Sequence, residues 1–156
     1  WLGIFDRSHY EDIVMPRLYG TVPEDQWRAR YDEINTFEHD LVAGGCTILK
    51  IFLVSSKEEQ KKHFLDRLDD PTKYWKFDPS DLEARDRWDE YMDAWQEVFE
   101  KTSTDDAPWY IVPADNRWYS RAVASELLRI SMRNMNLMWP PLSVDADEMR
   151  RRLEND

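Results

Sequence analysis

An acidic and a basic side chain stand together at the end of a short apolar stretch. Residues 1–5 have the apolar character of a buried strand, and Asp6 and Arg7 follow directly. α/β nucleotide enzymes hold Mg²⁺ near phosphates with an aspartate at such a strand end, and an adjacent arginine can bind phosphate oxygens through two N–H groups. A structural role explains the same pattern, with Asp6 capping the next segment and Arg7 pairing with Glu11. These residues alone leave both roles open.

A second group of chemistry-bearing residues is cationic and lies around an irregular segment. Residues 69–80 contain two prolines, show no periodicity and separate two expected helices. The cations in and around this segment are Arg67, Lys73, Lys76, Arg85 and Arg87. Mobile lids that neutralise transferred phosphoryl charge have this character, but so does a solvated surface with local ion pairs to Asp66, Asp69 and Asp70.

Other chemistries find less support in the sequence. His9, His39 and His63 are scattered without metal-binding spacing, which favours surface or packing roles. No serine stands in a G-x-S-x-G context, and Cys46 is expected in the core at the start of a strand. The four glycines, Gly3, Gly20, Gly44 and Gly45, never precede a lysine, so the chain contains no G-x-x-x-x-G-K-[ST] phosphate loop.

The elements that would position these residues alternate between strands and helices. Strands are expected at residues 1–5, 46–54 and 109–112, and helices at 22–43, 56–68, 80–99 and 118–137, with a weak polar helix or tail at 145–154. Capping-box spacing at Thr21 and Glu24 predicts the first helix start, and Ser55 or Ser56 the second. Alternation indicates an α/β fold with a parallel sheet, although three strands are too few for an independent domain of this class.

Composition restricts the class of protein further. The chain of 156 residues fits one domain, and 42% hydrophobic residues allow a packed core. A net charge of −11 argues against nonspecific binding to nucleic acid or to an anionic membrane. The single cysteine excludes an internal disulfide and fits a reducing compartment, the cytoplasm. No signal peptide or membrane-spanning run is evident, and a start at Trp1 inside an apolar stretch is typical of a fragment or a processed product.

Several short motifs occur in the order found in the family-2 polyphosphate kinases, which the chain resembles over residues 1 to about 130. The matching stretches are Phe5-Asp-Arg-Ser-His-Tyr-Glu-Asp12, Pro16-Arg17, Ile48-Leu-Lys-Ile-Phe-Leu53, Glu58-Glu-Gln60, Asp69-Asp-Pro-Thr-Lys73, Trp75-Lys-Phe77, Arg87-Trp-Asp89 with Tyr91, Ala107-Pro-Trp109, and Pro113-Ala-Asp115 with Trp118-Tyr119. So many ordered matches are more specific than any single motif.

The resemblance implies a three-layer P-loop kinase fold, similar to thymidylate kinases, with a parallel sheet and a helical lid. Residues 1–137 would be the C-terminal part of that domain, with the lid at about 66–87, and residues 138–156 a C-terminal extension. The family transfers phosphoryl groups between inorganic polyphosphate and nucleoside mono- or diphosphates with Mg²⁺. The acceptors expected here are AMP, ADP or guanine nucleotides such as GDP, since His9-Tyr-Glu-Asp12 resembles the branch associated with AMP as well as ADP.

The resemblance also implies roles for individual residues. Asp6 would be the Walker B aspartate that holds the metal, and Arg7 and Arg67 would act on the transferred phosphate. Further phosphate contacts would come from Arg17, Lys73 and Lys76. Tyr10 and Glu11 would bind the nucleotide. The family is also associated with homo-oligomers, and the apolar residues Trp139 and Leu142 of the tail could form such a contact.

The Walker A loop of the family is missing from this sequence. The chain is therefore expected to be the C-terminal part of an enzyme that transfers phosphate directly and in line, and to be inactive alone. Two alternatives stay open: an ATP-dependent nucleoside monophosphate kinase, and a noncatalytic module that binds polyanions or mediates assembly. The segment Asp70-Pro-Thr-Lys-Tyr-Trp-Lys76 argues against the first, and the missing loop favours the second.

Overall fold

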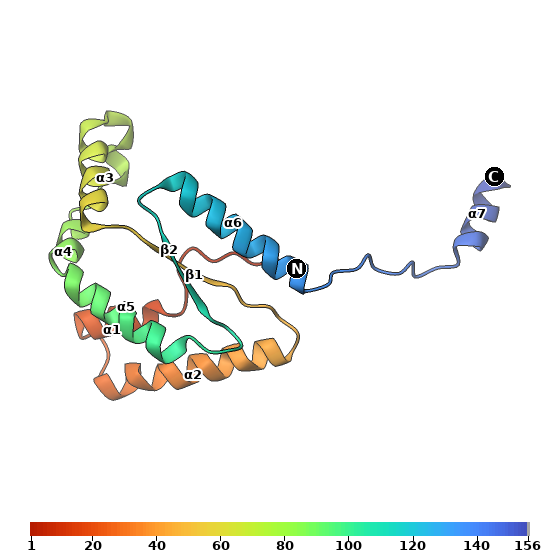
Figure 1. Cartoon of the computed structure of the whole chain (residues 1–156), viewed down its shortest axis with the longest axis horizontal. Helices are drawn as coiled ribbons and strands as arrows, with labels where there is room; N and C mark the ends of the chain where they lie inside the picture. The colour runs from red at the N-terminus through yellow and green to blue at the C-terminus, as the bar shows by residue number, and fades with distance from the viewer. Residues whose placement is uncertain (156) are drawn as a thin grey trace.

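The computed structural model describes residues 1–155, which form a short sheet surrounded by helices (Figure 1). The elements in chain order are α1 (Glu11–Tyr19), α2 (Glu24–Ala43), β1 (Lys50–Val54), α3 (Lys57–Asp69), the 3-10 helix η1 (Pro71–Lys76), α4 (Ser80–Asp86), α5 (Trp88–Thr102), β2 (Trp109–Pro113), α6 (Arg117–Asn134) and α7 (Ala146–Glu154).

The sheet of the described residues consists of two parallel strands. β1 and β2 pair from Lys50 opposite Trp109 to Val54 opposite Pro113. The chain between them forms α3, η1, α4 and α5, the long helical crossover that a parallel pair requires. The helix-rich arrangement with a small parallel sheet fits an incomplete P-loop-kinase-like fold of the α/β class.

Residues 1–5 correct one prediction, since they form no strand. Trp1, Ile4 and Phe5 are all exposed, whereas a buried strand was expected. A strand is held by hydrogen bonds to a neighbour, and β1 and β2 pair only with each other in the described chain. Leu53 of β1 and Ile111 of β2 are also more than half exposed. The sheet thus presents uncovered apolar surface.

Helix starts follow local capping at some positions and not at others. The Ser56 hydroxyl accepts a hydrogen bond from the Glu59 backbone N–H, which confirms the cap predicted for α3. The capping box predicted at Thr21 and Glu24 is wrong, because α2 has Pro23 at its N-cap without a side-chain hydrogen bond. Pro23 has extended backbone angles, so the helix can begin only after it.

The strand predicted at residues 46–54 is shorter than expected. Only residues 50–54 are in β1, because β2 offers five residues for pairing. Cys46 lies outside the strand and is exposed, which corrects its placement in the core. The turn before it contains Gly45 at φ 92°, a left-handed conformation that glycine adopts without steric cost.

Two other predicted boundaries also moved. The aperiodic residues 69–80 contain η1, and the helix expected at 80–99 is divided at Arg87 into α4 and α5. The helix expected to reach Leu137 ends at Asn134. The Asp70 carboxylate caps the start of η1, because it accepts a hydrogen bond from the Thr72 backbone N–H. This segment is therefore a short helix rather than an open loop.

The hydrophobic core lies between α1, α2, α5 and one face of the sheet. Its buried members are Tyr10, Ile13, Val14, Leu18, Trp27, Tyr31, Ile34, Ala94 and Val98. Both strands join it through aromatic contacts: the Phe52 ring lies 4.8 Å from Trp95, and the Trp109 ring 4.8 Å from Tyr10. The core therefore fixes the start of α1 against β2.

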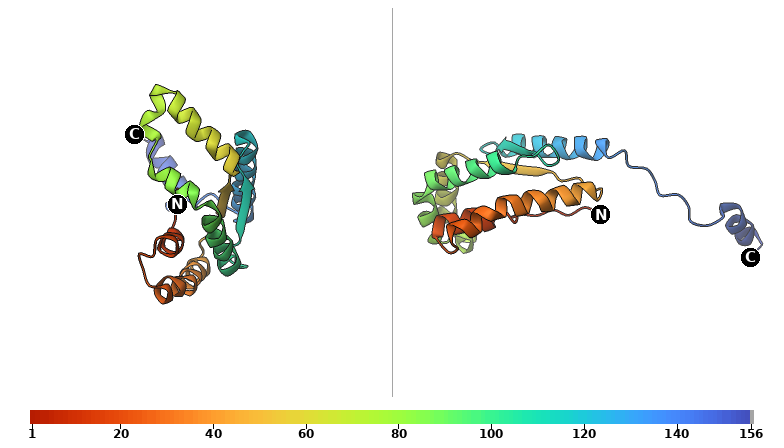
Figure 2. Two further views of the ribbon diagram at one scale, coloured as in Figure 1. Left: turned by 90° about the vertical axis from the view of Figure 1, so that its left-hand side faces the viewer. Right: turned by 90° about the horizontal axis from the view of Figure 1, so that it is seen from below.

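The C-terminal arm, residues 135–155, leaves the body as an extended segment that ends in α7 (Figures 1 and 2). Trp139 in this arm is 95% exposed. The accessible surface of 12,087 Å² exceeds the value of about 8,300 Å² typical of a compact monomer of this mass. Among residues 1–155, no helix is both long enough and apolar enough to cross a membrane.

Candidate active site

Asp6 and Arg7 form an exposed bend that residues 8–10 connect to α1. The Arg7 guanidinium lies 3.6 Å from the Glu11 carboxylate, the pairing that the structural interpretation predicts. This pair is open to solvent, so it contributes only about 0–1 kcal/mol and a phosphate can replace it. Within residues 1–155, the Asp6 carboxylate makes no hydrogen bond or ion pair. An open carboxylate and an exchangeable arginine thus stand side by side.

The bend carries backbone strain at Arg7. Its φ of 113° lies in a region that non-glycine residues rarely adopt. Such a conformation persists only where the surrounding structure holds it, and it is common at ligand-binding sites.

The residues present fit a magnesium ion held mainly by water and substrate. Among the described residues, no three His, Cys, Asp or Glu side chains are placed to hold a metal ion together. Mg²⁺ in phosphoryl-transfer sites commonly takes one or two carboxylates and fills its other positions with water and substrate phosphates. The exposed Asp6 carboxylate is suited to that arrangement.

Tyr10 and Arg17 are engaged inside the helical body. The Tyr10 ring is 1% exposed, and its hydroxyl donates a hydrogen bond of 2.5 Å to Glu38. The Arg17 guanidinium donates to the Glu97 carboxylate at 2.6 Å, and Arg28 donates to the same carboxylate at 2.8 Å. In this arrangement Tyr10 presents no polar atom to a nucleotide, and Arg17 would have to exchange Glu97 for a phosphate.

The expected lid cations lie on α3 and η1, which project from the end of the sheet (Figure 1). Arg67 donates to the Lys76 backbone carbonyl at 3.1 Å and to the Asp81 carboxylate at 3.3 Å. Lys73 contacts Asp66 at 2.9 Å and Asp70 at 3.0 Å, and these contacts raise the pKa of Lys73.

Lys76 differs from its neighbours because its ammonium group faces an aromatic ring. The ammonium lies 5.0 Å from the Trp75 ring centroid and, within residues 1–155, has no carboxylate partner. The Trp75 indole N–H donates to the Thr72 carbonyl at 3.1 Å, which fixes the ring. Of the three expected lid cations Arg67, Lys73 and Lys76, Lys76 is therefore the most accessible to an anionic ligand.

The structure does not bring the two groups of candidate residues into contact. Within the described chain, no hydrogen bond or ion pair joins the Asp6–Arg7 bend to Arg67, Lys73 or Lys76. A bound polyanion or a movement of the lid would have to connect them.

Sequence reasoning missed a contact where the two strands end. The Ser56 backbone N–H donates to the Asp115 carboxylate at 2.7 Å, which ties the start of α3 to the segment after β2. Hydrogen bonds from Ser56 lower the pKa of Asp115. The available signal was the polar residue that follows each apolar strand, since the carboxyl ends of parallel strands meet at one edge.

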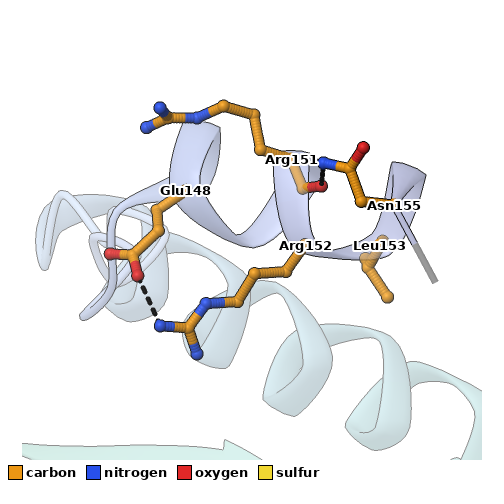
Figure 3. Close-up of a pocket in the computed structure, with 5 residues that line it drawn as sticks. All are labelled: Glu148, Arg151, Arg152, Leu153 and Asn155. Atoms are coloured by element: carbon orange, nitrogen blue, oxygen red, sulfur yellow. Dashed lines mark hydrogen bonds and ion pairs between the residues drawn. The ribbon is translucent and has the colours of Figure 1, made fainter.

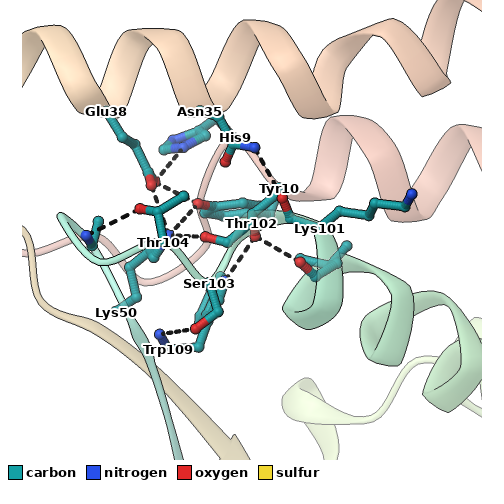
Figure 4. Close-up of polar contacts among 12 residues, drawn as sticks. His9, Tyr10, Asn35, Glu38, Lys50, Lys101, Thr102, Ser103, Thr104 and Trp109 are labelled. Carbon is teal, nitrogen blue, oxygen red and sulfur yellow. Dashed lines mark hydrogen bonds and ion pairs between the residues drawn. The ribbon is translucent and has the colours of Figure 1, made fainter.

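A buried polar cluster around Lys50, which includes Tyr10 and Glu38, was also missed (Figure 4). The Lys50 ammonium donates to Glu38 at 2.7 Å, and both side chains are at most 5% exposed. Burial lowers the pKa of Lys50. Burial alone raises the pKa of Glu38, but hydrogen bonds from His9, Lys50 and Tyr10 outweigh it, so that pKa lies below its ordinary value. Two features of the sequence could have indicated this cluster. Lys50 interrupts an apolar strand, and Glu38 follows Ile34 by four residues and so lies on the same, buried helix face.

A further open space lies beside α7, away from the candidate residues described above. It measures about 740 Å³ and is lined by Glu148, Arg151, Arg152, Leu153 and Asn155, all on that one helix or at its end (Figure 3). The Arg152 guanidinium is already paired with Glu148 at 2.6 Å. A single exposed helix does not enclose a substrate, so this space does not compete with the Asp6–Arg7 bend as a candidate site.

Comparison with known proteins identifies relatives that are named as polyphosphate phosphotransferases. Residues 1–138 match the family model described as Polyphosphate kinase 2. The chain is 43% identical over 139 residues to the AMP/ADP-polyphosphate phosphotransferase of Meiothermus ruber, and 38% identical over 151 residues to the ADP-polyphosphate phosphotransferase of Rhodopseudomonas palustris. In each case the match covers 89% of this chain and 52% of the relative.

A solved structure agrees with these sequence matches. The crystal structure of Polyphosphate Kinase 2 from Arthrobacter aurescens TC1 matches with a TM-score of 0.93 and 44% identity, covering 99% of this chain and 54% of that chain. The chain thus spans about half the length of the relatives named here. Since the family model matches residues 1–138 of the 156, the chain belongs to the polyphosphate kinase 2 family.

Proposed function

We propose that the complete protein transfers phosphoryl groups between inorganic polyphosphate and nucleotides, with AMP, ADP or guanine nucleotides as acceptors and Mg²⁺ as cofactor. The carrying observation is family membership together with the open Asp6 carboxylate beside Arg7. The relatives' names support AMP and ADP as acceptors. The proposal concerns the whole protein, of which this chain supplies the metal-binding bend and the lid.

In this proposal the chain's own residues position two polyanions for direct, in-line transfer. Asp6 holds Mg²⁺, which when bound neutralises phosphate charge. Arg7 exchanges Glu11 for a phosphate oxygen, and the released Glu11 accepts hydrogen bonds from the nucleotide. Alignment and charge neutralisation account for most of the catalysis in phosphoryl transfer, so no covalent intermediate on the protein is needed.

The lid completes this proposal from the other side of the substrates. Lys76 binds polyphosphate without losing a carboxylate partner, whereas Arg67 and Lys73 exchange their exposed ion pairs for phosphate. Solvent screens those ion pairs, so a charge-assisted phosphate contact is stronger than each of them. Arg17 joins the phosphate contacts only if the substrate displaces Glu97.

The experiment compares polyphosphate and ATP as phosphate donors for AMP, ADP and GDP, using the full-length gene product that contains this chain. Asp6→Asn keeps the side-chain shape and removes the charge, so turnover from polyphosphate should fall by about 100-fold or more while the fold survives. Asp32→Asn, at an exposed position on α2, is the matched control. A preference for ATP would favour the nucleoside monophosphate kinase, and absence of turnover with polyanion binding intact would favour the noncatalytic module.

We also propose that the C-terminal arm mediates homo-oligomer formation. The arm carries Trp139 and Leu142, which are 95% and 66% exposed. Light scattering of the full-length protein should show an oligomer that Trp139→Ser weakens. An unchanged mass would refute a role for the arm. The domain boundary near residue 137 and a cytoplasmic location stay predictions.

A further inference from the structure

We propose that the buried Lys50–Glu38 pair acts through Tyr10 as a positioning device for the Asp6–Arg7 bend. The inference rests on the proposed function, in which that bend binds metal and phosphate. It assigns positioning roles to Lys50 and Glu38, and it places Tyr10 beneath the site rather than in contact with the nucleotide.

The Lys50 ammonium joins segments that are distant in the sequence. It donates to Glu38 of α2 at 2.7 Å, to the Thr102 carbonyl at the end of α5 at 2.7 Å, and to the Tyr10 hydroxyl at 2.9 Å (Figure 4). These three bonds use all the donors of an ammonium group. Tyr10 in turn donates to Glu38, so its hydroxyl is fixed by both members of the ion pair.

Tyr10 transmits this constraint to the bend through the backbone. It stands immediately before α1 and three residues after Arg7. The Glu11 N–H donates to the Ser8 carbonyl at 3.0 Å, so consecutive turns link Tyr10 to the bend. His9 adds a second attachment, since its Nε2 lies 3.4 Å from Glu38.

The strain at Arg7 indicates that the bend needs such an anchor. A φ of 113° is sparsely populated for arginine, and the side chain itself is held only by an exposed pair with Glu11. The buried cluster is the rigid attachment nearest to the bend along the chain. An immobilised Tyr10 shortens the free segment to the few residues around Arg7.

The charged character of the cluster supports positioning over simple core filling. A buried ion pair is often no more stabilising than well-packed apolar residues of the same volume, because desolvation offsets the attraction. What a hydrogen-bonded pair adds is direction, since each donor and acceptor tolerates a narrow range of angles. Here those directions converge on one tyrosine hydroxyl.

Tyr10→Phe in the full-length gene product provides the test. The variant keeps the ring, which packs against Trp109, and removes only the hydroxyl. We expect amide hydrogen exchange at residues 8–12 to become at least tenfold faster. We expect kcat for transfer from polyphosphate to fall at least tenfold, because small misplacements of reacting groups are costly. A rise in KM for the nucleotide should occur only together with the faster exchange, because Glu11 lies in the same segment. Tyr110→Phe, at an exposed residue of β2, is the matched control and should change neither the exchange nor kcat.

A second variant covers the case in which Tyr10→Phe fails to fold. Lys50→Met combined with Glu38→Leu replaces the pair by apolar groups, and the same faster exchange with a near-parental melting temperature is expected. Unchanged exchange at residues 8–12, or faster exchange with an unchanged kcat, would overturn the proposal. A raised KM for the nucleotide with normal exchange would also overturn it and make Tyr10 a direct contact. Failure of the proposed function is separate, because the unmodified protein would then show no turnover from polyphosphate, or Asp6→Asn would retain that turnover, whatever the hydrogen exchange at residues 8–12.

Discussion

Replacing Lys50 with methionine removes one charge from the buried cluster and leaves a side chain of similar length. The Glu38 carboxylate then stays 3% exposed without its ammonium partner, and the Thr102 carbonyl and the Tyr10 hydroxyl each lose a donor. Removing one member of a buried ion pair typically costs 3–5 kcal/mol, because the other charge stays buried and uncompensated (about 4 kcal/mol as a central value). We therefore expect Lys50→Met to destabilise the fold strongly.

The expected shift in melting temperature follows from this free energy. For a domain of about 150 residues, 1 kcal/mol lowers the melting temperature by roughly 2–4 °C, so Lys50→Met should lower it by roughly 6–20 °C. Urea unfolding followed by tryptophan fluorescence measures the free energy directly. Lys62→Met is the matched control, since Lys62 is paired with Glu59 at 2.9 Å on the surface, where solvent screens the pair, and its loss should leave the stability nearly unchanged.

The double variant separates loss of charge from loss of packing. Lys50→Met with Glu38→Leu removes both charges, and most of the lost stability should return because no charge is left buried. If Lys50→Met alone costs less than about 1 kcal/mol, Glu38 is not held as a buried anion and the reasoning from its burial is wrong. If the double variant is no more stable than the single one, packing rather than charge controls this part of the core.

Three further predictions concern the lid, the whole chain and pH. Arg67→Ala should leave the melting temperature nearly unchanged, since the ion pair between Arg67 and Asp81 is partly exposed. The same variant should lower kcat/KM for polyphosphate by about 10²–10³, and Arg67→Lys should recover little of it. A large loss of stability with intact kinetics would contradict this. The 156-residue chain alone should form no detectable ADP or ATP from polyphosphate with Mg²⁺, because it lacks a glycine-rich phosphate loop, and turnover near that of a full-length relative would refute this. The third prediction concerns pH: the pKa of Glu38 in the folded protein lies below its unfolded value near 4.5, so its stabilisation is present above pH 4.5 and is lost as the pH falls toward the folded pKa. The difference in unfolding free energy between the parent and Glu38→Gln should therefore narrow below pH 4.5. A constant difference across that range in urea titrations would show that Glu38 does not titrate as argued.

The amino-acid sequence determined what depends on local pattern. Helical spacing of apolar residues located α2 and α5, Ser56 marked the start of α3, and the parallel arrangement followed from the alternation of strands and helices. The ordered motifs identified the family, because a long series of short matches is specific without any knowledge of contacts. These features depend on residues that are close together in the chain.

Tertiary structure decided what depends on partners from distant segments. Residues 1–5 have the sequence of a strand but none of the hydrogen-bonding neighbours that a strand needs. Tyr10 resembles a ligand-binding residue in its motif, yet Glu38 and Lys50 enclose it from positions 28 and 40 residues away. A lysine in an apolar strand is costly by itself, and only the fold supplied the carboxylate, carbonyl and hydroxyl that make its burial tolerable.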